Sequence, residues 1–244
     1  MLSFFDHLFL MVTLGMLMGC AIHKGPVVYE NAQTTDTSCV SKEDLAAAIK
    51  SLSSPLNDAK LTQVRQVIFD NAKRSEKCRT QVVTALMTAM DKPNLDFEHD
   101  PESYNTWTYG AGFLGELKAA EALDLLLAHL KDTDGLSASM SHFPALDGVI
   151  AMGSIAIPKL SEILKKHPDR YMRRSAAFCL AEIGGPTATS ALREALANDT
   201  DQCNRQFLAI SIKALENRQQ PNQITAGDRA EWYSAFYCSE ESAK

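Results

Sequence analysis

One helical pattern occurs three times in the chain, and this internal repetition constrains the fold more than any other feature. Each copy has an apolar segment rich in small residues, a glycine at its end, a short link, and a second segment with regularly spaced leucines. The copies cover residues 111–127, 149–164 and 179–196. Their glycines, at positions 115, 153 and 184, lie 38 and 31 residues apart, the spacing of solenoids built from two-helix repeats. Since a single helix pair cannot bury its apolar faces, we expect the copies to stack.

The joints and faces of these copies fit pairs of helices. A glycine at a helix end can adopt the left-handed conformation that closes the last turn, and we expect Gly115, Gly153 and Gly184 to do so. The first copy continues with an apolar stripe of helical period, formed by Leu123, Leu126, Leu127 and Leu130. Two further stripes lie within residues 61–68 and 82–89. Runs of β-branched residues with period-2 alternation are missing after residue 41, so the sequence predicts an all-α fold.

These motifs resemble the HEAT-like repeats first noted in phycobilisome lyases. That family has an Asp in the turn between repeats and an Arg early in the next helix, and Asp169 with Arg173 or Arg174 matches this pattern. The resemblance covers residues 102–217 and extends more loosely to residues 41–90. It implies a short right-handed α-solenoid of two-helix repeats. A fold of this kind says little about function by itself.

The two ends of the array have their own signals. Ser41 with Asp44 resembles a capping box that opens the first helix. After Asn217 the repeat pattern stops, and the aromatic segment 228–238 is predicted to form a C-terminal capping helix, since solenoids need a polar end cap. The polar segment 91–101 is longer than the other joints. It is either a functional insert or a plain connection carrying Phe97.

The first twenty residues indicate the compartment. The apolar run from Leu8 to Met18 is shorter than the roughly 17–25 residues that span a bilayer, and it is typical of a signal-peptide core. Its end, Leu17-Met18-Gly19-Cys20, resembles a bacterial lipobox, in which the cysteine is lipidated and becomes the mature N-terminus. Plain secretion and an uncleaved anchor are the alternatives. We therefore expect a signal peptide over residues 1–19, a flexible tether over 20–40, a solenoid over 41–217, and a C-terminal cap and tail over 218–244.

The cysteines are consistent with an address outside the cytoplasm, where thiols near the surface tend to be oxidised. Lipidation of Cys20 leaves five, and Cys179 lies in an apolar segment, where a free buried thiol is common. Along a solenoid, residues distant in sequence are distant in space. The sequence therefore predicts the bonds Cys39–Cys78 and Cys203–Cys238.

The charged residues suggest one candidate binding surface. Although the net charge is −6, which disfavours nucleic-acid binding, positive charges cluster in one short stretch. This basic island consists of Lys165, Lys166, Arg170, Tyr171, Arg173 and Arg174. It could bind an acidic protein segment or an anionic lipid head, or it could be a solvated turn in which one Arg has a structural role.

Signs of catalysis are scarce. The six histidines are scattered, and Glu98-His99-Asp100 is the nearest approach to a metal-ligand cluster. Cys-x-x-Cys spacing and phosphate-binding glycine loops are missing, so we expect no catalytic residues, no metal and no cofactor. The sequence thus favours a non-enzymatic protein-binding scaffold or adaptor at the cell envelope, lipid-anchored and facing the periplasm, with the outer membrane favoured. Its expected partners are other envelope proteins, and the membrane through the anchor. The alternatives are a structural spacer and a lyase-like or metal-dependent enzyme subunit.

Overall fold

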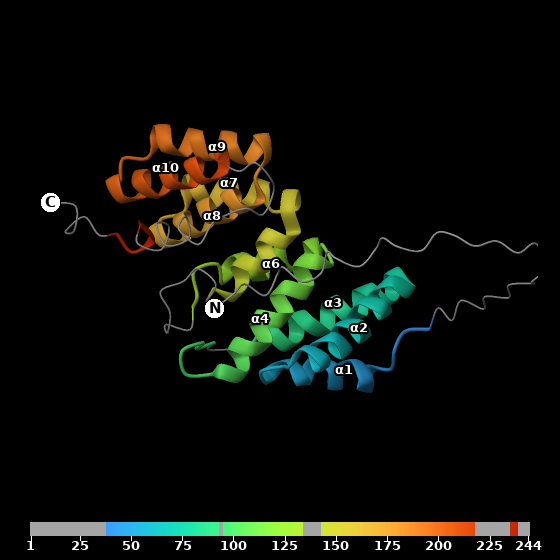
Figure 1. The fold of residues 1–244 in the computed structure, drawn as a ribbon. Coiled ribbons are helices and arrows are strands. Elements are labelled where there is room, and N and C mark those ends of the chain that lie inside the picture. The colour runs from blue at the N-terminus through green and yellow to red at the C-terminus, as the bar shows by residue number, and fades with distance from the viewer. Residues whose placement is uncertain (1–37, 93–94, 134–142, 218–234, 239–244) are drawn as a thin grey trace, which may run out of the picture. The chain divides into compact units, whose positions relative to one another are not determined.

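A computed structural model of the chain describes residues 38–92, 95–133, 143–217 and 235–238 (Figure 1). All of these belong to one unit of the chain, which begins at Asp36. Within them the ordered elements are helices and there is no strand. No helix in these ranges is long and apolar enough to cross a membrane. The predicted signal peptide, most of the tether and most of the predicted helix 228–238 lie outside the described residues.

The helices follow one another with short connections. They are α1 (Lys42–Lys50), α2 (Asp58–Arg74), α3 (Glu76–Met90), α4 (Pro101–Glu116), α5 (Leu123–Ala128), α6 (Pro144–Met152), α7 (Ile157–Lys166), α8 (Arg170–Ile183), α9 (Gly185–Asn198) and α10 (Gln202–Glu216). Short 3-10 helices are η1 (Ser51–Ser53), η2 (Ala120–Ala122) and η4 (Gly153–Ile155).

Neighbouring helices stack in two rows. In one row α4 packs on α6, α6 on α8, and α8 on α10; in the other, α7 packs on α9 (Figure 1). Contacts between α5 and α6, α7 and α8, and α9 and α10 join the rows. This arrangement is the stacking of two-helix repeats, and it confirms the predicted all-α solenoid.

Local sequence explains where the helices begin. Ser41 accepts a hydrogen bond from the backbone N–H of Asp44, as its capping motif predicts. Asn57, Ser75, Asp100, Asp169 and Asp201 cap α2, α3, α4, α8 and α10 in the same way. Proline occupies the first turn of α4, α6, α7 and α9, where its missing N–H costs nothing.

The predicted apolar stripes form the core. Leu123, Leu126, Leu127 and Leu130 are all buried, and so are Val64, Ile68, Val82 and Leu86 of the two earlier stripes. One apolar cluster runs from Leu45 in α1 to Phe236 near the C-terminus. The repeats therefore share a continuous core.

The glycines at the joints have two different roles. Gly153 and Gly184 end their helices with φ of 65° and 73°. These are backbone conformations that residues with a Cβ rarely adopt. The prediction for Gly115 is wrong, because it lies inside α4 and Lys118 takes the positive φ of 52° instead. A Cβ on Gly115 would collide with the main-chain oxygen of Gly148 in α6. Gly115 therefore allows two helix backbones to approach closely.

Candidate functional site

The basic island does not form a single cluster. Lys165 pairs with Glu194 at 2.8 Å, and Lys166 lies 3.4 Å from Glu162. Asp169, the capping residue of α8, forms an ion pair with Lys131, and its carboxyl pKa is lowered by the hydrogen bond from that lysine, against the opposing effect of burial. Glu194 and Glu162 thus offset the charge of the two lysines of the island, while Asp169 is paired with a lysine outside it.

Arg174 is buried, so it does not lie on an exposed basic surface. Its exposed fraction is 1%. Nε donates to Asn204 Oδ1 at 2.8 Å, and Nη1 donates to the main-chain oxygens of Phe236 and, at 3.2 Å, Cys238. Burial lowers the pKa of this guanidinium. The side chain is therefore used to bind the segment that precedes the C-terminal tail.

Arg170 and Tyr171 lie between surface and core. The Arg170 guanidinium is 5.3 Å from the centre of the Tyr171 ring, and that ring packs 5.5 Å from the ring of Phe236. Both side chains are only partly exposed. Of the six residues of the island, Lys165 and Lys166 remain as its exposed part.

Arg173 closes a joint between repeats. It donates to the main-chain oxygens of His167 and Pro168, at 2.8 and 3.0 Å, just after the end of α7. Arg205, which follows Asp201 with the same spacing as Arg173 follows Asp169, donates to the oxygens of Leu196 and Asp199, at 2.6 and 3.2 Å. Both arginines thus donate to carbonyl groups at or just after the end of the preceding helix.

We expect Arg173→Ser and Arg205→Ser each to lower the free energy of unfolding by about 1 kcal/mol, because each removes two hydrogen bonds to carbonyl groups. Lys166→Ser, whose side chain is 75% exposed, is the control and should leave stability unchanged. Urea denaturation followed by circular dichroism measures all three. Equal midpoints for the three variants would mean that the arginines do not hold the joints.

Two of the hollows on the surface of the array have lysines in their lining. One, of about 490 Å³, is lined by the ends of α7 and α9, and it contains Lys165, Lys166 and Arg173 together with Glu194 and Asp199. Its walls carry both signs of charge. The second, of about 480 Å³, lies between α1 and α3, with the apolar residues Leu45, Ala46 and Ala85 in its wall and Lys42 and Lys77 among its lining. Sequence reasoning missed this groove, because its two walls come from helices that are separated by α2.

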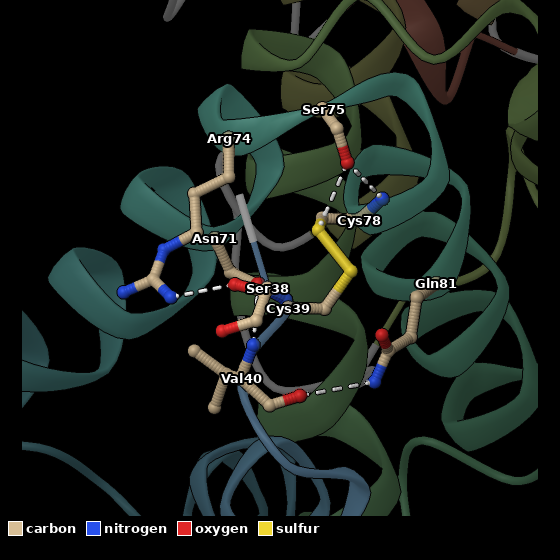
Figure 2. The surroundings of a disulfide bond; sticks show 8 residues. All are labelled: Ser38, Cys39, Val40, Asn71, Arg74, Ser75, Cys78 and Gln81. Carbon is tan, nitrogen blue, oxygen red and sulfur yellow. Dashed lines mark hydrogen bonds between the residues drawn. A yellow bond between two sulfur atoms is a disulfide. The ribbon is translucent and has the colours of Figure 1, made fainter. Parts of the chain in front are cut away.

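The first disulfide fixes the start of the array. Cys39 and Cys78 are bonded, with 5.2 Å between their Cα atoms (Figure 2). Around them, Val40 N–H donates to Asn71 Oδ1 at 2.9 Å, and Arg74 donates to Ser38 O at 2.7 Å. Gln81 Nε2 also donates to Val40 O at 3.4 Å. The segment 38–40 is thereby attached to both α2 and α3.

The second disulfide lies near the other end. Cys203, in the first turn of α10, is bonded to Cys238, with 5.7 Å between their Cα atoms. Cys179 is a free thiol within the described residues, and its complete burial raises the pKa of the thiol. The structure thus contains the pairing that the sequence predicts. Closing loops of this length stabilises a fold by about 3–4 kcal/mol for each bond in the chain-entropy model.

The histidines that the structure describes have separate environments. His99 is exposed beside Asp96 at 3.0 Å, while Asp100 caps α4, so the Glu98-His99-Asp100 cluster does not converge. His129 accompanies Asp132 at 2.7 Å and packs 4.5 Å from the Trp107 ring. Over the described ranges, no group of three or more His, Cys, Asp or Glu side chains is placed to hold a metal ion. Phe97 is buried against Trp107, which makes segment 95–100 a packed connection.

Comparison with known proteins gives one result. The family model of HEAT repeats matches residues 154–225. This part of the chain is similar to HEAT repeats. The match runs from η4 through α10, the region in which Arg173 and Arg205 occupy equivalent positions. No curated protein and no solved structure matches the chain.

The contacts between neighbouring repeats explain the position of one arginine of the basic island, Arg173. Of the two arginines that could fit the family pattern, Arg173 is the one that contacts the preceding turn, and Arg205 repeats this contact in the next unit. Arg174, one position further along α8, is instead buried against α10 and the segment 235–238. The repeat architecture supports a protein-binding surface in general, since stacked helix pairs present an extended face.

Proposed function

We propose that this chain is a protein-binding scaffold held at the bacterial cell envelope by a lipid on Cys20. The observation that carries the proposal is the similarity of residues 154–225 to HEAT repeats, which commonly hold other proteins. The groove between α1 and α3 supports it further, because an apolar wall with lysines among its lining suits a partner helix that has acidic edges.

Two features support the proposed localisation to the cell envelope. Leu17-Met18-Gly19-Cys20 has the character of a lipobox, and Ala21 after the cysteine favours the outer membrane. Four cysteines also form disulfides, which persist in oxidising compartments and are rare in the cytoplasm. The segment between Cys20 and Cys39 would then join the anchor to the first repeat.

We expect the mature protein to begin at Cys20 and to carry diacylglycerol on that side chain. Intact-mass and N-terminal peptide analysis of protein purified from membranes measures both features. A Cys20→Ala variant should lose the lipid and leave the membrane fraction. Mature protein that starts at another residue, or an unmodified Cys20, would rule out this anchor.

Photo-crosslinking in intact cells tests the scaffold itself. A photoreactive amino acid is placed at Thr84, in the groove between α1 and α3, and for comparison at the exposed Ala209 of α10. We expect one discrete adduct with an envelope protein from the groove position. The adduct should disappear when the array is unfolded by a second substitution in the core. Absence of adducts at both positions and at Lys166 would favour a structural spacer instead.

A further inference from the structure

The segment 235–238 occupies a slot on the array in the manner of a bound peptide. Of its two aromatic side chains, that of Phe236 is only 2% exposed. The Phe236 ring lies 5.3 Å from the ring of Phe143, 5.5 Å from Tyr171 and 5.9 Å from Phe207, residues that come from the N-terminal end of α6, from α8 and from α10. Three separate helical regions thus surround one aromatic side chain that follows them in sequence. The backbone of segment 235–238 is drawn in red in Figure 1.

A buried arginine recognises the main chain of the same segment. Arg174 Nη1 donates to the main-chain oxygens of Phe236 and Cys238, and Nε donates to Asn204 Oδ1. Asn204 is itself hydrogen-bonded to Asp199 and Asp201, so the guanidinium is fixed in place. Arg174 Nη2 is buried and has no acceptor among the residues that the structure describes. Since a buried donor without an acceptor is costly, the slot has unused capacity for a ligand oxygen.

We propose that this slot, formed by Phe143, Tyr171, Arg174, Asn204 and Phe207, is a peptide-binding site that the chain's own residues 235–238 occupy and the Cys203–Cys238 disulfide keeps closed. The partner it fits is the C-terminal segment of another protein, with an aromatic residue two positions before a free carboxylate. A carboxylate offers two oxygens and can accept from Nη1 and Nη2 together, as arginine favours. The inference rests on the proposed scaffold function and names one partner chemistry for it.

A dithiol reductant would open the slot. Its thiolate attacks one sulfur of the Cys203–Cys238 bond, forms a mixed disulfide and releases the other cysteine as a thiolate, which takes up a proton. The second thiolate of the reductant then displaces the remaining cysteine. The products are two cysteine thiols and one oxidised dithiol, with two electrons transferred. Apart from the main chain, segment 235–238 is then held in the slot by noncovalent contacts, and a competing peptide can displace it.

Binding of a labelled peptide tests the proposal. The probe is fluorescein-labelled Ser-Ala-Phe-Tyr-Ser with a free carboxylate, which corresponds to residues 234–238 with serine in place of the cysteine. The full chain carrying Phe236→Ala and Cys238→Ser should bind it with saturable anisotropy. The oxidised unsubstituted chain should bind at least about tenfold more weakly, because its slot is filled. Replacing the probe's Phe by Ala should also weaken binding at least about tenfold, as for a buried aromatic anchor.

The role of Arg174 is tested by changing the C-terminal carboxylate of the probe. An amidated probe should bind the opened chain more weakly than the acid, and Arg174→Gln in the opened chain should abolish this difference. Opened chain that keeps its native circular dichroism but binds no probe, or binds the Ala probe equally well, overturns the proposal. If the opened chain does not fold, the unsubstituted chain is measured with and without dithiothreitol. Unfolding of a Cys203→Ser, Cys238→Ser variant, in which the Cys39–Cys78 bond stays intact, would show that segment 235–238 is part of the core and no exchangeable ligand. Each of these failures leaves crosslinking at Thr84 unaffected, so the scaffold proposal is tested separately.

Discussion

Replacing Leu126 by aspartate is expected to lower the free energy of unfolding by at least about 4 kcal/mol, enough to unfold most single domains. Leu126 is completely buried in α5, at the centre of the leucine stripe that joins its repeat to the core. The substitution removes a large apolar side chain and places a carboxylate at a completely buried position of the apolar core.

Thermal unfolding followed by circular dichroism measures this effect. Ala128→Asp is the matched control, because Ala128 is exposed on the same helix. Its cost should stay below about 1 kcal/mol, the scale of an unfavourable charge near a helix C-terminus. An unchanged midpoint for Leu126→Asp would mean that the stripe faces solvent.

Gly115→Ala is expected to destabilise the array by about 3 kcal/mol, at the upper end of overpacking in a close-packed core. The added Cβ would collide with the Gly148 main-chain oxygen and lie 2.7 Å from the Ala151 Cβ, so the backbones of α4 and α6 must separate. A flexible side chain could move aside, whereas the backbone of a packed helix cannot do so cheaply.

Gly112→Ala, one turn earlier in α4, is the control with the opposite sign. A Cβ there meets nothing within 4 Å. It should stabilise the chain by about 0.5–1 kcal/mol, the usual difference between glycine and alanine inside a helix. Chemical denaturation measures both variants. A stabilising Gly115→Ala would contradict the close approach of α4 and α6.

The sequence was sufficient for the features that depend on one helix at a time. Leucine periodicity identified the buried face of α5, and Ser41 with Asp44 identified the first cap, because both follow from helix geometry alone. Gly153 and Gly184 were also predictable, since a chain that leaves a helix needs a positive φ at that point.

The remaining features depend on how two helices meet, which one helix's periodicity cannot specify. Gly115 looks like a helix-ending glycine until the position of α6 is known. Arg173 and Arg174 are adjacent, yet they project about 100° apart around α8, and only the tertiary structure shows which one faces α10. The groove between α1 and α3 likewise exists only once α2 has turned the chain back.

The central claim is that the array has a disulfide near each end and lies outside the cytoplasm. Non-reducing peptide mapping of the chain purified from bacterial envelopes tests this claim most directly. We expect one linked peptide pair containing Cys39 and Cys78 and another containing Cys203 and Cys238. Cys179, buried in α8, should be alkylated only after denaturation. Finding Cys179 in either bond would contradict the fold at that end of the array, and finding all of these thiols free would contradict the envelope address.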